Sequence, residues 1–213
     1  MKKYLIIVFC FLYYGCESYS DRFHKKEDYN EKPSEYSYSD IRYYDIAGEK
    51  QRVQKTEYDD DDVKRKETFY RDEKPYRIRI YDEKGRIMKE DTYSNFPDSG
   101  YRIMYYFNGN VKEEYEFINF EEKNGEFSSY YENGGLQSDL EYLNGQPSRT
   151  CSWYYPSGNL MRIKDYLEDS NYQIDFYENG ERKSEGTFKG SELTGRWVFY
   201  DSDGRLSSEE DYF

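Results

Sequence analysis

The sequence has few of the residues that most often carry enzymatic chemistry. Its 213 residues include one histidine, His24, and three cysteines. Cys10 and Cys16 lie near the N-terminus, so only Cys151 remains in the body of the chain and no intramolecular disulfide is available there. No histidine follows His24, so neither a Ser–His–Asp triad nor a base that would activate Cys151 is expected. We predict a protein that is not an enzyme.

Motifs for phosphate and metal binding are also missing. Glycine-rich phosphate loops and cysteine-based zinc spacings do not occur. The acidic run Asp59–Asp62 lacks the spaced Asp/Asn, Gly and distal Glu of a calcium loop, so a solvated turn is the favoured interpretation. Paired carboxylates such as Glu113 and Glu114 are frequent, but adjacent residues of a strand face opposite ways. We therefore predict no catalytic residue, no cofactor and no metal site.

The charge balance is strongly acidic. The formal net charge is −13, from 44 Asp and Glu against 31 Lys and Arg. Nucleic acid and anionic lipid surfaces are held by clustered basic side chains, so both are disfavoured as partners. The acidic excess is consistent with a well-solvated surface, and it would also attract a basic protein partner.

Aliphatic residues are scarce and tyrosine is abundant. Hydrophobic residues make up only 36% of the chain, and 28 residues are tyrosines. Tyrosine suits thin sheets, because its ring packs as an apolar body while its hydroxyl stays in water. Aromatics amount to 20% of the residues, far more than disordered chains carry, and aromatic residues favour strands. The composition predicts an ordered β structure.

The N-terminus has the layout of a signal peptide. Met1, Lys2 and Lys3 precede eleven apolar residues, 4–14, and Gly15 and Cys16 follow. Eleven residues are too few for a membrane-spanning helix, which needs about 20. Gly15 before Cys16 resembles the cleavage box of bacterial lipoproteins, which implies a lipidated Cys16. We predict an exported, membrane-anchored lipoprotein on the periplasmic or outer-surface side, with ordinary secretion or an uncleaved segment as the alternatives.

The predicted domain organisation starts from this leader. Residues 1–15 form the signal peptide. Residues 16–40 have neither helical nor strand periodicity and are predicted to be a flexible tether, with His24 as a solvated residue. Residues 41–80 are interpreted as degenerate capping hairpins, and residues 81–213 as six repeats.

The repeats are defined by glycines that recur every 22 to 25 residues. The glycines are Gly85, Gly109, Gly134, Gly158, Gly180 and Gly204. Four residues before them stand Tyr81, Tyr105, Tyr130, Tyr154, Phe176 and Tyr200, and eight after them stand Tyr93, Phe117, Tyr142, Tyr166, Phe188 and Tyr212. Two residues after the glycine the residue is apolar in five cases of six. All positions below are counted from this glycine, so that the residue four before it is position −4.

Each repeat unit is predicted to form a β-hairpin. Positions +2 and +8 differ by an even number, so on a continuous strand they share one face. Asn-Gly and Asp-Gly pairs, as in Asn108-Gly109, tolerate the two positive φ angles of tight hairpin turns. Second glycines at Gly125, Gly145 and Gly195 are expected at the links between hairpins. We predict an all-β fold: an extended single-layer antiparallel meander of repeated β-hairpins.

The segments 195–206 and 130–136 resemble the bacterial MORN-variant repeat, roughly G-x-W-x-x-Y-x-x-x-G-x-L followed by charged residues and an aromatic. The resemblance covers about residues 76–213. Proteins built of this repeat are commonly assigned to the YwqK family of toxin–antitoxin systems, so the resemblance implies an antitoxin or immunity role with a toxin as partner. The matching residues are turns and packing aromatics, and none of them is a binding residue.

A second tyrosine row follows the −4 aromatics directly, at Tyr106, Tyr131, Tyr155 and Tyr177. It is interpreted either as cross-strand packing or as an exposed partner-binding strip on the opposite face. The leading hypothesis is a non-enzymatic repeat scaffold that mediates protein–protein interaction. The alternative is a cell-surface glycan-binding or structural lipoprotein. Membrane contact is expected only through the lipid anchor.

Overall fold

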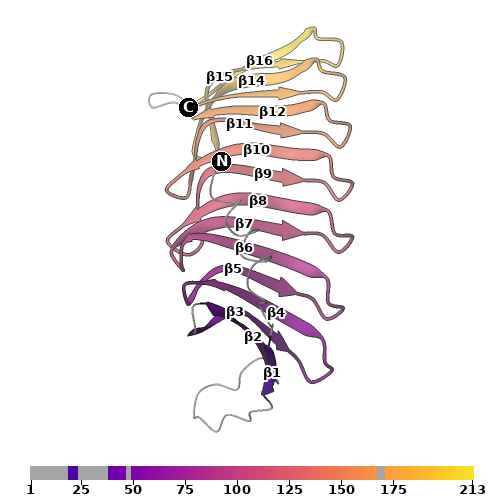
Figure 1. The fold of residues 1–213 in the computed structure, drawn as a ribbon. Helices are drawn as coiled ribbons and strands as arrows, with labels where there is room; N and C mark the ends of the chain where they lie inside the picture. The colour runs from indigo at the N-terminus through magenta and orange to yellow at the C-terminus, as the bar shows by residue number, and fades with distance from the viewer. Residues whose placement is uncertain (1–18, 24–37, 47–48, 167–170) are drawn as a thin grey trace. The chain divides into compact units, whose positions relative to one another are not determined.

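The computed structural model describes residues 19–23, 38–46, 49–166 and 171–213, and every regular element in these ranges is a β-strand (Figure 1). The chain divides into two compact units, Met1–Phe96 and Pro97–Phe213. The predicted signal peptide, Cys16 and His24 lie outside the described residues. Strand β1 and the first residues of β2 lie within residues 16–40, for which a flexible tether was predicted.

The first unit is an antiparallel meander in which each strand pairs with the next along the chain. Its strands are β1 (Tyr19–Phe23), β2 (Tyr38–Ile46), β3 (Glu49–Tyr58), β4 (Lys64–Arg71), β5 (Lys74–Tyr81) and β6 (Ile87–Asn95).

The second unit follows the same rule. Its strands are β7 (Ser99–Tyr105), β8 (Val111–Ile118), β9 (Glu122–Tyr130), β10 (Leu136–Leu143), β11 (Gln146–Tyr154), β12 (Leu160–Tyr166), β13 (Asn171–Phe176), β14 (Arg182–Lys189), β15 (Glu192–Tyr200) and β16 (Leu206–Tyr212). The predicted fold class, an all-β antiparallel meander of hairpins, is confirmed.

The repeat glycines lie in the turns of the hairpins, but the turn type differs from the prediction. At Gly109, the glycine N–H donates to the Tyr106 carbonyl (2.9 Å) and the Tyr106 N–H donates to the Asn110 carbonyl (2.8 Å). Gly109 has a φ of +90°, whereas Asn108 keeps a negative φ. The loop is therefore a three-residue turn closed by a glycine bulge, which needs one positive φ instead of two.

The first unit contains the same turn without a glycine. The Asp59 N–H donates to the Val63 carbonyl (3.1 Å), the Asp62 N–H donates to the Asp59 carbonyl (3.3 Å), and Asp62 has a φ of 62°. Asp62 thus occupies the glycine position of the β3–β4 hairpin. Asp59 Oδ1 accepts hydrogen bonds from the N–H groups of Asp61 (3.1 Å) and Val63 (2.9 Å), so the acidic run forms a turn.

A second bulge changes which residues share a face. In the β7–β8 hairpin Tyr105 pairs with Val111, but Met104 pairs with Glu113, so Lys112 is an extra residue. The expectation that positions +2 and +8 share one face is therefore wrong. Val111 lies on the face of Tyr105, and Phe117 lies on the opposite face. The same shift recurs in the other glycine-turn hairpins of the second unit.

The links between hairpins use a different turn. Asn144 and Gly145 form a two-residue turn in which both φ angles are positive. The link between Ile118 and Glu122 has three residues, and the first two, Asn119 and Phe120, have positive φ. Gly145 lies at a link as predicted. Gly125 and Gly195 instead lie inside β9 and β15, so that part of the prediction is wrong. Both have positive φ, and Arg149 in β11 has a φ of 55° at the equivalent position.

The buried side chains of the second unit all lie on one face of its sheet, here called the core face. They are Arg102, Tyr115, Phe117, Phe127, Ser138, Leu140, Cys151, Gln173, Ser184, Phe188 and Trp197. The other face carries the −4 aromatics together with Glu114, Asp139 and Glu185, and is here called the acidic face.

Candidate interaction surface

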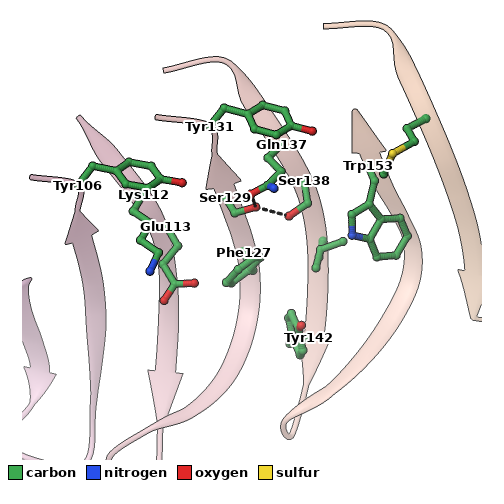
Figure 2. A pocket seen from close by; sticks show the side chains of 12 residues that line it. Tyr106, Lys112, Glu113, Phe127, Ser129, Tyr131, Gln137, Ser138, Tyr142 and Trp153 are labelled. Carbon is green, nitrogen blue, oxygen red and sulfur yellow. Dashed lines mark hydrogen bonds between the residues drawn. The ribbon is translucent and has the colours of Figure 1, made fainter. Parts of the chain in front are cut away.

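A shallow pocket of about 350 Å³ opens on the core face of the second unit (Figure 2). Three successive hairpins contribute its walls. The apolar and aromatic lining residues are Tyr106, Phe127, Tyr131, Leu140, Tyr142, Trp153 and Met161. The polar lining residues are Lys112, Glu113, Ser129, Gln137 and Ser138. One positive and one negative side chain leave the pocket close to neutral in an otherwise acidic protein.

The bulge after each turn positions several of these side chains. Lys112, Gln137 and Met161 all stand at position +3, the extra residue of their hairpins. A bulge re-aims side chains, so two consecutive residues, such as Gln137 and Ser138, line the same pocket. The hydroxyls of Ser129 and Ser138 are hydrogen-bonded across β9 and β10 at 2.7 Å (Figure 2). The bulges thus direct extra side chains toward the pocket.

The tyrosine row predicted as a binding strip joins neighbouring hairpins. Each hydroxyl donates to the backbone carbonyl of the −4 residue in the next hairpin: Tyr106 to Tyr130 (2.8 Å), Tyr131 to Tyr154 (2.6 Å), Tyr155 to Phe176 (2.8 Å) and Tyr177 to Tyr200 (2.9 Å). All four side chains are half-buried. Tyr106 and Tyr131 also line the pocket, and a binding role for the row stays a prediction.

Asparagines at the turns form a parallel set of contacts. The side-chain amides of Asn108, Asn159 and Asn179 donate to the backbone carbonyls of Glu132 (2.9 Å), Glu178 (2.8 Å) and Ser202 (2.8 Å) in the next turn. Together with the tyrosines, they link successive turns through hydrogen bonds. The pocket therefore lies beside a row of contacts that hold neighbouring hairpins together.

The repeats that build this surface match a known family model. The chain contains four MORN repeat variants. They span residues 99–119, 123–144, 150–168 and 172–189, all within the second unit. MORN repeats typically mediate protein or membrane binding. A comparison with curated proteins found no match.

Two tyrosine–carboxylate hydrogen bonds form a ladder on the acidic face that the sequence reasoning missed. Tyr130 donates to Glu114 (2.6 Å), and Tyr200 donates to Glu185 (2.7 Å), so in both cases a −4 tyrosine donates to the +5 carboxylate of the preceding hairpin. These hydrogen bonds, more than burial, raise the pKa of both tyrosines. The signal was present in the sequence, because position +5 is acidic at Glu90, Glu114, Asp139, Glu185 and Glu209.

Two lysines on the core face of the MORN repeats lie against aromatic rings. The Lys123 ammonium is 3.7 Å from the centroid of the Phe127 ring and 5.0 Å from that of Tyr115. The Lys164 ammonium is 4.2 Å from the centroid of the Phe188 ring. Burial lowers the pKa of both lysines. These cation–π contacts stabilise charge within a thin core and explain how lysines are tolerated there.

The described part of the chain contains one free cysteine and shows no cluster of metal-ligating side chains. Cys151 is fully buried, its thiol is 3.7 Å from the Ser148 carbonyl, and burial raises its pKa. A cysteine in this environment is structural, since reactive cysteines need a lowered pKa and exposure. Among the described residues, no group of three His, Cys, Asp or Glu side chains is placed to hold a metal ion. None of the described segments forms a helix suited to crossing a membrane.

Proposed function

We propose that this chain is a non-enzymatic scaffold that binds another protein through the core face of its MORN repeats. The pocket at Trp153 is the observation that carries the proposal. It joins an aromatic and apolar wall to several hydrogen-bonding side chains, which is the composition of protein-binding sites. Successive repeats build it, so it lies on the part of the chain that the MORN matches cover.

The hydrogen bonds between neighbouring hairpins beside the pocket support a binding role. The tyrosine and asparagine contacts already hold the pocket walls in place, so a partner would not need to order them. Preorganised sites lose less conformational entropy on binding. The net charge of −13 adds long-range attraction for a basic partner.

A pull-down from native membranes tests the proposal. The intact protein should recover a specific protein that the variant Trp153→Ala does not recover. Leu143→Ala serves as the control, because Leu143 is 61% exposed and is not one of the residues that line the pocket. Recovery of no specific protein, or equal recovery by the Trp153 variant, would contradict the proposal.

We further propose that the scaffold is an exported bacterial lipoprotein, anchored through Cys16, that serves as an antitoxin or immunity protein of the YwqK type. The leader 1–15 and the repeat resemblance support this proposal. The variant Cys16→Ser should move the protein from the membrane to the soluble fraction. Protection of cells against a toxin encoded beside it should then be lost, and unchanged protection would contradict the anchored immunity role.

The alternative is a glycan-binding surface protein. The indole of Trp153 and the rings of Tyr106 and Tyr131 lie beside Ser129 and Gln137, and such a mixture of rings and polar groups also suits sugars. This alternative predicts retention on cell-wall or capsular polysaccharide that is lost in Trp153→Ala. Retention that survives the substitution would exclude the pocket as a glycan site.

A further inference from the structure

We propose that the pocket at Trp153 accepts a proline-rich segment of the partner protein in the polyproline II conformation, lying across the hairpins. The inference rests on the proposed function and names the chemistry of the partner. It follows from the spacing of the aromatic residues, from the free donor in the pocket and from the lack of net charge there.

The spacing of the hairpins matches the pitch of a polyproline II helix. Neighbouring strands lie about 4.7 to 4.9 Å apart, so equivalent residues of successive hairpins, such as Tyr106 and Tyr131, repeat every ~9.5 Å. A polyproline II helix advances about 3.1 Å per residue and has three residues per turn, which gives a pitch of ~9.3 Å. One turn of such a helix would therefore meet each hairpin.

Trp153 supplies the donor that this kind of ligand needs. Proline has no N–H, so a proline-rich segment presents carbonyl oxygens and apolar rings. The Trp153 indole N–H has no hydrogen-bond partner among the described residues, and Figure 2 shows the ring nitrogen on the side that faces the other lining side chains. Trp197 provides the contrast, since its indole N–H donates to the Thr187 carbonyl at 2.7 Å and its side chain is 1% exposed.

The charge of the pocket favours the same ligand. Among its lining residues, Lys112 and Glu113 are the charged pair and they offset each other. Aromatic-lined grooves that bind proline-rich segments rely on ring packing and on a few donors instead of on ion pairs. The apolar wall of Phe127, Leu140 and Met161 gives the pyrrolidine rings a surface to pack against.

The test uses the purified full chain and two synthetic peptides. Decaproline is the probe, and a Gly-Ser decapeptide of equal length is the flexible control. Binding is followed by tryptophan fluorescence and by calorimetry. Trp153 and Trp197 are the two tryptophans of the sequence, and Trp197 is buried, so a ligand in the pocket should change the emission of Trp153. We expect decaproline to bind and the control peptide not to bind.

Three variants separate the contributions of the Trp153 ring and of its N–H donor to peptide binding. Trp153→Ala should weaken binding at least about tenfold, because it removes both ring and donor. Trp153→Phe keeps a ring without the N–H and should weaken binding less. Leu143→Ala, on the acidic face, should bind as the intact protein does. Thermal melting of each variant verifies that the sheet remains folded.

Several results would overturn the inference. One is the absence of decaproline binding up to about 1 mM. Another is equal affinity in a folded Trp153→Ala variant. Binding of a chito-oligosaccharide that is lost in Trp153→Ala, without decaproline binding, would make the pocket a glycan site. A partner that is recovered from membranes through Trp153 but is not displaced by decaproline would leave the scaffold function standing and contradict this inference alone.

Discussion

The indole ring of Trp197 lies directly over Gly186. A Cβ atom added at Gly186 would be 2.5 Å from Cδ2 of Trp197. The ring is held there because its N–H donates to the Thr187 carbonyl, and the side chain is 1% exposed. Gly186 pairs with Gln173 on the core face, so the missing side chain leaves the space that the largest residue of the core fills. The contact between Gly186 and Trp197 thus packs β15 closely against β14 on the core face.

Gly186→Ala is predicted to destabilise the protein. The added methyl would force Trp197 out of its position, and overpacking of this kind costs about 1 to 3 kcal/mol. Urea denaturation measures the change in the free energy of unfolding. Gly135→Ala is the matched control, since the nearest contact there would be the flexible Asn133 side chain at 3.2 Å. Equal effects of the two substitutions would contradict the packing described here.

Removing one hydroxyl of the tyrosine row should destabilise the packing of one hairpin against the next. Tyr131→Phe deletes the 2.6 Å hydrogen bond to the Tyr154 carbonyl and should cost about 0.5 to 1.5 kcal/mol. Tyr142→Phe provides the comparison, because the Tyr142 hydroxyl has no hydrogen-bond partner among the described residues. We expect little change there. If Tyr131→Phe proves as stable as the intact protein, the row does not tie the hairpins together.

The thiol of Cys151 should not react with thiol reagents in the folded protein. It is 0% exposed, and burial raises its pKa, so little thiolate is present or accessible. In a background of Cys10→Ser and Cys16→Ser, labelling by a disulfide reagent should follow the unfolding of the sheet as urea is added. Rapid labelling in the absence of urea would show that the core face opens locally.

Stability should decline in acid partly through Glu185. Burial alone would raise the pKa of this carboxyl, but hydrogen bonds from Tyr200 and Tyr172 and the charge of Arg182 outweigh it and lower the pKa. A lowered folded-state pKa contributes stability above the ordinary glutamate value of about 4.3, and the contribution disappears as the pH falls through the folded value.

Glu185→Gln should therefore destabilise the protein at pH 7 by about 1 kcal/mol and reduce its loss of stability below pH 4.3 or so. Denaturation curves at a series of pH values measure both effects. Glu192→Gln, at an exposed position, is the control. A pH profile identical to that of the intact protein would mean that the ladder on the acidic face does not stabilise the carboxylate.

The positions of the hairpin turns were predictable from the repeat glycines. Gly109 and its equivalents adopt positive φ, which glycine tolerates without strain, and the flanking aromatic residues recur at fixed distances. The fold class followed from this periodicity alone. The glycine spacing could not predict that Asp62 takes the position of the turn glycine in the β3–β4 hairpin. An aspartate can adopt the same left-handed conformation when its neighbours form the turn hydrogen bonds.

The faces of the sheet were harder to predict. The extra residue at Lys112 and its equivalents shifts the alternation by one, so Phe117 moves to the face opposite Val111. A bulge of this kind leaves no composition signal, since position +3 is Lys, Gln or Met in the hairpins that form the pocket. The buried −7 position is equally varied, with Arg102, Phe127, Cys151, Gln173 and Trp197. The side chains that meet at the pocket are set by the strand pairing and its bulges. No pattern of residue types in the sequence indicates them.

The most direct test of the account is the affinity of the protein partner recovered from native membranes for the purified intact protein and for Trp153→Ala. The account predicts that the folded variant binds this partner at least about tenfold more weakly, while Leu143→Ala binds it unchanged. Equal affinities for the intact protein and the Trp153 variant would show that partners bind elsewhere and would contradict the assignment of the core-face pocket as the interaction site.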